Sequence, residues 1–193
     1  MTRICVFCGS SSGTDPVYSR TAAAVGEFLA ENGIELVYGG GRVGLMGTVA
    51  DSVLANGGRV IGVIPEALDK KEIAHKGLTE LHVVTSMHQR KALMAELSDG
   101  FVAMPGGFGT FEEICEIVTW AQLGIHQKPC GLLNVNGFYD PLIELFDRST
   151  GSGFIRPEHR QIILVGTEID GLFESMKNFK PPAIEKWIDN DST

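Results

Sequence analysis

The sequence lacks the features that mark membrane, secreted and nucleic-acid-binding proteins. No apolar stretch approaches the length needed to cross a bilayer. Residues 1–4 lead directly into a strand-like segment, so we expect no signal peptide. Basic residues form no run and the net charge is −8, which argues against a nucleic-acid polymer as partner. We therefore expect a cytoplasmic protein with neither a membrane nor a nucleic acid as partner.

Cysteine is also scarce, and its spacing does not form a disulfide framework. Cys5 and Cys8 make a C-x-x-C pair, but they lie in or at the end of an apolar strand, whereas the redox motif begins a helix. A zinc site would need a second close pair, and Cys115 and Cys130 are too far apart in sequence. We expect four reduced cysteines that act as small hydrophobic residues, and no metal site.

The remaining composition is that of an ordinary globular domain. The chain has 193 residues, of which 44% are hydrophobic and 21% charged, enough for one domain with a sizeable core. No internal repeat, linker or second domain is visible. We expect a single domain over residues 1–179 and a polar, mobile tail over residues 180–193.

Short apolar segments alternate with segments of helical periodicity. The expected strands are residues 3–8, 34–38, 59–64, 81–85, 100–104, 131–135 and 162–165, and the expected helices are residues 16–32, 43–56, 86–98, 109–124, 138–149 and 168–177. Residues 66–78 are expected to be irregular or briefly helical. The alternation predicts an α/β fold with a parallel sheet and helices on both faces. Ligands bind such sheets at the carboxyl ends of the strands.

The most informative segment is the glycine-rich loop within residues 104–113, Met-Pro-Gly-Gly-Phe-Gly-Thr-Phe-Glu-Glu. A strand, a glycine loop and a helix N-terminus together present backbone N–H groups to an anion, typically phosphate. Thr110 can cap the helix and donate to a phosphate oxygen. Glu112 and Glu113 would repel a phosphate, so one of them is expected to serve chemistry beside it. In the alternative, purely structural interpretation, Thr110 is a cap and both carboxylates complement the helix dipole.

A second glycine loop covers residues 39–44 and formally matches the G-x-G-x-x-G dinucleotide fingerprint. The match is weak because the acid expected after the next strand is replaced by Ile64-Pro65. We interpret the loop as a close backbone approach to a phosphate or sugar; the alternative is a tight turn that packs the helix on the sheet. The loop at residues 9–13 lies at the same predicted edge.

Arg90 begins an apolar stripe formed with Leu93, Met94 and Leu97. An arginine at that place points into a site, and a buried arginine needs a carboxylate or a phosphate as partner. Lys91 fits a solvated surface lysine and a ligand contact equally well. His88 fits an ordinary helix-start residue better than a catalyst, and charge spacing alone would make Glu72 a solvated loop residue.

Together these motifs resemble the LONELY GUY family of cytokinin-activating phosphoribohydrolases, which are often mislabelled lysine decarboxylases. The two signatures are Met87-His88 with Arg90-Lys91, and the segment from Pro105 to Glu113. Further similar segments are residues 38–41, 44–47 and 119–124. The resemblance covers about residues 3–165, and the region beyond carries no family signal.

The resemblance implies a Rossmann-like, doubly wound homodimer. It would hydrolyse the N-glycosidic bond of adenine nucleoside 5′-monophosphates, AMP or N6-prenylated AMP, to a free base and ribose 5-phosphate, without a cofactor. Arg90 and Glu113 correspond to the catalytic pair. Substrate contacts implied by the family or by the loops are Ser10, Gly40, Gly41, Glu72, Lys91, Gly106, Gly107, Gly109, Thr110, Glu112 and Thr119.

The chemistry of the residues agrees with that reaction. Cleavage of a ribosyl–base bond passes through an oxocarbenium-like state, which a carboxylate such as Glu113 can stabilise, or it can activate water. Arg90 could hold Glu113, anchor the ribose phosphate or assist the leaving base. Two other classes remain: a non-catalytic nucleotide or cofactor carrier, and a pyridoxal-phosphate lysine decarboxylase with Lys91 as its Schiff-base lysine.

Overall fold

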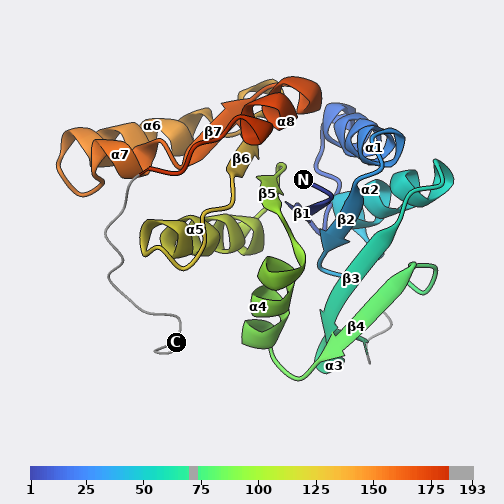
Figure 1. Ribbon diagram of the computed structural model, residues 1–193. Helices are drawn as coiled ribbons and strands as arrows, with labels where there is room; N and C mark the ends of the chain where they lie inside the picture. The colour runs from blue at the N-terminus through green and yellow to red at the C-terminus, as the bar shows by residue number, and fades with distance from the viewer. Residues whose placement is uncertain (70–73, 183–193) are drawn as a thin grey trace.

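A computed structural model describes residues 1–69 and 74–182 (Figure 1). Within them, seven parallel strands form one sheet in the order β4-β3-β2-β1-β5-β6-β7. The strands are β1 (Arg3–Phe7), β2 (Glu35–Tyr38), β3 (Val60–Pro65), β4 (Glu80–Val84), β5 (Gly100–Ala103), β6 (Cys130–Leu133) and β7 (Ile163–Gly166). The predicted parallel α/β architecture is confirmed.

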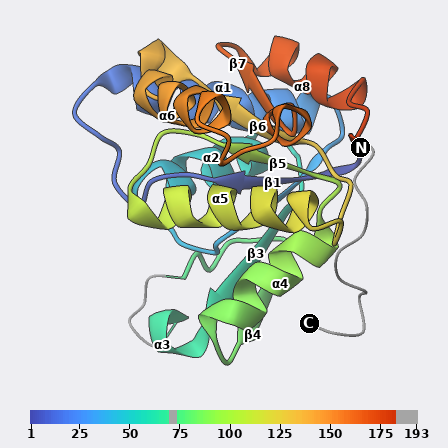
Figure 2. The same cartoon turned by 90° about the vertical axis from the view of Figure 1, so that its left-hand side faces the viewer.

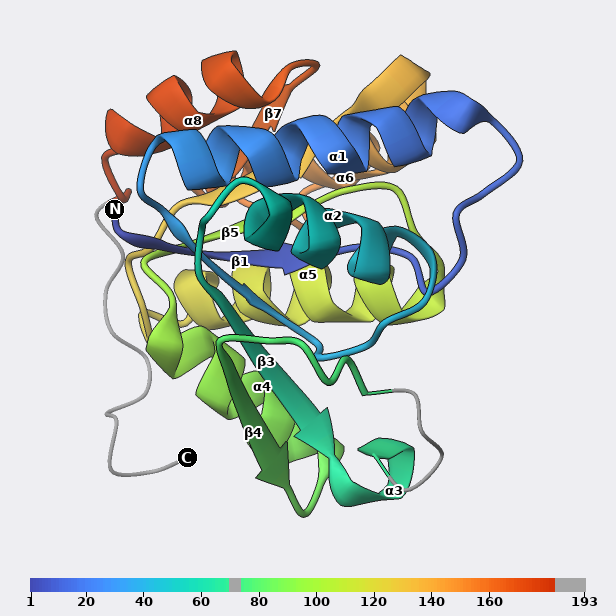
Figure 3. The same ribbon diagram turned by 90° about the vertical axis from the view of Figure 1, so that its right-hand side faces the viewer.

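Helices cover both faces of this sheet. They are α1 (Pro16–Glu31), α2 (Gly44–Ala55), α3 (Glu66–Asp69), α4 (Met87–Leu97), α5 (Phe108–Gln122), α6 (Asp140–Gly151), α7 (Pro157–Arg160) and α8 (Ile169–Lys177), with a 3-10 turn η1 (Val135–Gly137). Helices α4, α5 and α6 pack on one face (Figure 2), and α1, α2 and α8 on the other (Figure 3). The doubly wound arrangement therefore has one hydrophobic core on each side of the sheet.

Strand β1 shows how the sequence pattern produces these two cores. Successive side chains of a strand point to opposite faces, so Cys5 joins the α4–α5–α6 core whereas Cys8 joins the α1–α2–α8 core. The sheet itself separates the two sulfur atoms of the C-x-x-C pair. Burial raises the pKa of both thiols, which keeps them protonated. All four cysteines are free, as predicted, although Cys115 is exposed.

The ends of the elements follow local chemistry. Asp15 caps α1 by accepting a hydrogen bond from Val17 N at 2.8 Å, and Pro16 occupies the first helical position. Ser86 caps α4 by accepting from Gln89 N at 3.2 Å. Helix α7 was not predicted, because its four residues are too short to show helical periodicity.

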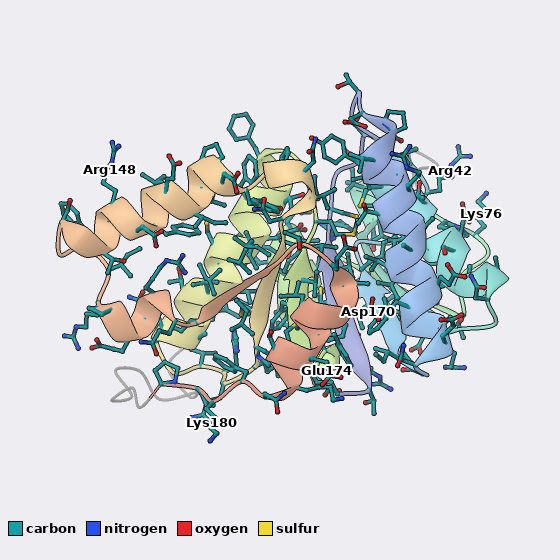
Figure 4. All side chains as sticks on the ribbon, turned by 90° about the horizontal axis from the view of Figure 1, so that it is seen from above. Arg42, Lys76, Arg148, Asp170, Glu174 and Lys180 are labelled. Atoms are coloured by element: carbon teal, nitrogen blue, oxygen red, sulfur yellow. The ribbon has the colours of Figure 1, made fainter. Side chains whose placement is uncertain are left out.

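Polar side chains surround the two cores. In the view from above, labelled charged residues such as Arg148 and Lys180 point outwards (Figure 4). No helix among the described residues is long and apolar enough to cross a membrane. Glu72 and residues 183–193 of the expected tail lie outside the described residues.

The strand order places the functional loops. The chain runs outward from β1 to the edge strand β4 and then returns through α4 to β5, beside β1. Loops that follow β1 and β5 therefore leave the sheet side by side at the point where the strand order reverses, where α/β sheets bind ligands. They touch directly, because Gly9 N donates a hydrogen bond to Pro105 O at 3.1 Å.

Candidate active site

Arg90 and Glu113 form a buried ion pair at the carboxyl edge of the sheet. Arg90 lies in the first turn of α4 and Glu113 near the start of α5. The distance from Arg90 Nη1 to Glu113 Oε1 is 3.2 Å, and each side chain is 9% exposed. Arg90 Nε also donates to Val63 O at 3.2 Å. Of the two partners predicted for a buried Arg90, a carboxylate or a phosphate, the carboxylate of Glu113 is present, and Val63 O accepts a second hydrogen bond from the guanidinium.

Gly39 makes room for this arginine. A Cβ atom at position 39 would overlap Arg90 Nη2, so any side chain there would displace the guanidinium. The sequence pattern assigned Gly39 to a turn or to a backbone approach toward phosphate. Its steric role could not be inferred from sequence, because Arg90 is distant along the chain and reaches the loop only once α4 has packed on the sheet.

The rest of this loop is occupied by protein contacts. Gly40 adopts a left-handed conformation with φ of 72°, and Gly40 O accepts a hydrogen bond from His75 N at 2.9 Å. Gly41 pairs with Ala74 in an isolated β-bridge. Gly40 and Gly41 are buried, and these contacts favour the packing interpretation for both over direct contact with a ligand. His75, whose Nε2 lies 2.8 Å from Asp51 Oδ1, was not anticipated from the sequence.

The electrostatic balance at Glu113 suits acid–base chemistry. Burial raises the pKa of its carboxyl, Arg90 opposes the increase and Glu112 adds to it; the net pKa lies above the ordinary value of 4.5. A raised pKa brings a carboxyl closer to the pH at which it exchanges protons efficiently. The ion pair keeps the ionised form accessible despite the burial.

The glycine loop after β5 leads into α5 as predicted, but Thr110 is not its cap. The N-cap is Gly107, whose backbone is extended, and no side chain bonds to the free amides. Thr110 lies inside the first turn and is 4% exposed. A Cβ atom on Gly106 would overlap Thr110 Oγ1, so the threonine packs directly beneath the loop. The helix begins one residue earlier than predicted because Gly107 supplies the extended entry.

A cavity of about 230 Å³ lies over the two loops at this edge. It is lined by Ser10 with its neighbours in residues 9–13, by Gly106 and Gly107, and by the rings of Tyr18 and Phe138. The uncapped start of α5 contributes to its wall. Ser10, Gly106 and Gly107, three of the predicted contacts, thus line one cavity, and Gly109 follows in the first turn of α5.

Lys91 bridges two helices, and its contact with a ligand stays a prediction. Its Nζ donates to Glu112 Oε1 and lies 2.9 Å from Glu116 Oε2, which ties α4 to α5. Burial alone would lower its pKa, but the hydrogen bonds and charges of the two glutamates outweigh this effect, and the pKa is raised. Lys91 is therefore a firmly protonated cation, and Glu112 is its partner as well as a residue of the first turn.

Thr119 is not brought to the Arg90–Glu113 pair. It follows Glu113 by six residues on α5, which places it about 120° around the helix and about 9 Å along it. Its side chain is exposed, and its hydroxyl donates to Cys115 O at 2.7 Å. It lines a separate cavity of about 200 Å³ between α5, α6 and α7. No cluster that could hold a metal ion occurs among residues 1–69 and 74–182.

Comparison with known proteins adds to this geometry. Residues 46–176 match the family model described as possible lysine decarboxylase. A probable cytokinin riboside 5′-monophosphate phosphoribohydrolase of Oryza sativa subsp. japonica is 52% identical over 92% of this chain and 79% of its own length. Cytokinin riboside 5′-monophosphate phosphoribohydrolases of Arabidopsis thaliana and Rhodococcoides fascians are 50% and 49% identical, over 93% and 91% of this chain and 82% and 89% of theirs.

Solved structures support the fold alone. The molybdenum cofactor carrier protein of Chlamydomonas reinhardtii has a TM-score of 0.69 at 20% identity, covering 91% of this chain and 96% of its own. The molybdenum cofactor binding protein of Rippkaea orientalis has a TM-score of 0.68, also at 20% identity, covering 91% and 95%. The sequence relatives, in contrast, span most of both chains at about half identity. The chain therefore belongs to the LONELY GUY family of cytokinin riboside 5′-monophosphate phosphoribohydrolases.

Proposed function

We propose that this protein hydrolyses the N-glycosidic bond of adenine-type nucleoside 5′-monophosphates and releases the free base and ribose 5-phosphate. The observation that carries the proposal is the buried Arg90–Glu113 ion pair beside an uncapped helix N-terminus. Relatives at about half identity are named for this reaction on cytokinin riboside 5′-monophosphates. AMP, which has the same ribose phosphate and purine, is the second candidate substrate.

In the proposed reaction each group has its own part. The 5′-phosphate binds the free amides at the start of α5, where the helix dipole favours an anion. Binding of this remote phosphate holds the anomeric carbon near Glu113, one to two turns along the helix. As the C–N bond breaks, the Glu113 carboxylate stabilises the positive charge on the ribose. Water then adds to that carbon, and its proton leaves while the base gains one at nitrogen.

The structure argues against lysine decarboxylation. A Schiff base forms from a neutral lysine amine, and enzymes lower the lysine pKa to obtain it. Here Glu112 and Glu116 raise the pKa of Lys91, which follows Arg90 in α4. The same contacts occupy its amino group. Lys91 therefore has the wrong protonation state for that chemistry.

A non-catalytic carrier on the same fold is the stronger alternative. It would use the glycine loops and the cavity above them, but it would gain nothing from burying an arginine and a glutamate together. Burial of two charges costs several kcal/mol per ion unless the pair is well compensated. That cost is readily explained if the pair stabilises a charged transition state.

The test is a product assay without added cofactor. We expect purified protein to release adenine from AMP, or a prenylated adenine from its nucleotide, measured by chromatography of the base. Adenosine, which lacks the 5′-phosphate, should be a poor substrate. Release of cadaverine from lysine with no base from either nucleotide would contradict the proposal, and equal turnover of adenosine and AMP would contradict the role of the α5 N-terminus.

We also propose that the protein is a homodimer in solution. A groove of about 520 Å³ runs between α4 and the end of α5. Its apolar lining is Ala92, Ala95, Trp120 and Ile125, and its polar lining is His88, Lys91, Glu96, Glu116, His126 and Lys128. A second copy would cover it and remove apolar surface from water. Because Thr119 does not reach the Arg90–Glu113 pair of its own chain, a partner subunit could also complete the substrate site.

Light scattering at micromolar concentration tests this proposal. We expect a mass of twice 20.8 kDa for the wild type and a shift toward the single mass for Ala92→Glu, which places a carboxylate on the apolar part of the groove. Leu145→Glu, at an exposed apolar residue of α6, is the matched control and should stay dimeric. A fully active wild-type monomer would refute the proposal.

A further inference from the structure

Tyr139 reaches the glycine loop from a different part of the chain. Its side chain comes from the segment between β6 and α6, yet its hydroxyl donates to Met104 O at 2.6 Å. Tyr139 is buried, with 1% of its surface exposed. Burial also raises the pKa of the phenol, so it remains a protonated donor. Met104 is the last residue before Pro105, and its carbonyl therefore belongs to the peptide plane that opens the loop.

This hydrogen bond is one of a series that fixes the entry to the loop. Met104 N donates to Phe7 O at 2.9 Å, which continues the pairing of β5 with β1. Tyr139 holds the carbonyl of the same residue, and Gly9 N holds the next carbonyl, that of Pro105. The proline ring fixes φ between these two carbonyls. The orientation of two consecutive peptide planes is thus fixed before Gly106. The anion-binding segment, residues 106–111, begins there.

A turn at residues 134–140 determines the position of Tyr139. Asn136 and Gly137 have φ of 51° and 71°, two successive residues in the left-handed region. Asn134 closes the turn: its Oδ1 accepts from Tyr139 N and its Nδ2 donates to Asp140 Oδ1, both at 2.7 Å. A non-glycine residue such as Asn136 in this region costs free energy that surrounding contacts must offset.

Aromatic contacts hold the ring as well. Phe138 and Phe111 both pack edge-on against Tyr139, with centroids at 5.0 Å and 6.4 Å. Phe111 belongs to the first turn of α5, and Phe138 lines the cavity above the glycine loop. Tyr139 therefore contacts both ends of the anion-binding segment, its entry through the hydroxyl and its helical end through the ring.

We propose that Tyr139 is a positioning residue, whose hydroxyl fixes the Met104–Pro105 peptide so that the following amides face the substrate phosphate. It touches no reacting atom and acts through the loop. This inference rests on the proposed function, because it assigns the phosphate of that substrate to the loop. Its specific consequence is that loss of the hydroxyl should weaken recognition of phosphate but not of the base.

Tyr139→Phe removes the hydroxyl and keeps the ring packing. We expect affinity for ribose 5-phosphate, measured by calorimetry, to fall by about three- to tenfold, the scale of one lost hydrogen bond. Affinity for adenine should stay within about twofold of the wild-type value, because the lost hydrogen bond belongs to the phosphate loop. KM for AMP should rise by more than kcat falls. Tyr38→Phe is the matched control, because that phenol is also buried but its hydroxyl has no hydrogen-bond partner in the described part of the chain.

The outcomes separate positioning from simple structural support. If Tyr139→Phe only lowers the melting temperature, and ribose 5-phosphate binds as it does to the wild type and to Tyr38→Phe, the inference is wrong. If adenine affinity falls as much as phosphate affinity, the role is general and the inference is also wrong. A wild type that binds ribose 5-phosphate but releases no base refutes the proposed function instead, and the two affinities still decide the role of Tyr139.

Discussion

Glu113→Gln is expected to lower turnover of the nucleotide by about a hundredfold or more, the range for loss of a catalytic carboxylate. Glutamine keeps the size of the side chain and can still accept from Arg90, but it carries no negative charge to stabilise the ribosyl cation. Nucleotide affinity should stay similar or rise, because a carboxylate near the phosphate has been removed. Initial rates of base release and calorimetric titration with AMP measure the two effects separately.

Glu112→Gln is the matched control for this change. Glu112 is the preceding residue, its side chain is 54% exposed, and its partner is Lys91, not Arg90. Lys91 also keeps Glu116, so the contact between α4 and α5 survives. We expect a much smaller loss of turnover. Equal losses in the two variants would show that the catalytic carboxylate has been misassigned.

Arg90→Met is expected to reduce kcat/KM by at least about a hundredfold, the scale for removal of one preorganised charge. It should also move the acid limb of the pH profile. The Glu113 pKa is already above 4.5 because of burial, and Arg90 is the group that opposes this increase. Without it the pKa rises further, so the active carboxylate appears only at higher pH. A pH–rate profile of the variant tests this shift.

Stability should change in a related way. Breaking a buried pair on one side costs about 3–5 kcal/mol, because the remaining charge is uncompensated. A carboxyl whose pKa is higher in the folded than in the unfolded state destabilises the fold as pH rises from 4.5 through the folded pKa. Over that pH interval, the free energy of unfolding of Arg90→Met should therefore fall more steeply than that of the wild type. Denaturant titrations at several pH values would show it.

Two further variants complete this test. The double variant Arg90→Met/Glu113→Gln should recover much of the lost stability but none of the activity, since no buried charge remains unpaired. Arg160→Met, which breaks an ion pair with Asp147 in which both partners are more exposed, should have little effect on either property. An unchanged acid limb in Arg90→Met would disprove the electrostatic role given to Arg90.

The parts of the fold that depend on local chemistry could be predicted from the sequence. Strand alternation, the Asp15 cap and the glycine loop before α5 follow from periodicity and backbone preferences. The burial of Arg90 and its need for a carboxylate or a phosphate as partner also followed, because both depend on its place in an apolar stripe. What could not be predicted depends on contacts between distant segments: Gly39 beneath Arg90, and Tyr139 against Met104.

The wrong or incomplete predictions have similar causes. Thr110 was expected to cap α5, but Gly107 could begin the helix without a side-chain cap, and the threonine instead fills the space below Gly106. The glutamate partners of Lys91 were not predicted, because a sequence cannot show that Glu112 and Glu116 approach it from another helix; its contact with a ligand stays a prediction. The assignment of Thr119 and Glu72 to substrate rests on family resemblance and remains a prediction.

The contact between Gly39 and Arg90 has a consequence for how such proteins diverge. An alanine Cβ at position 39 would overlap Arg90 Nη2 and displace the guanidinium. The sheet and the glycine loop after β5 would stay in place. A glycine codon becomes an alanine codon by a single base change. The evolutionary step from a hydrolase of this architecture to a protein that holds a nucleotide without cleaving it is therefore short, and it begins at a residue that makes no contact with the reacting bond.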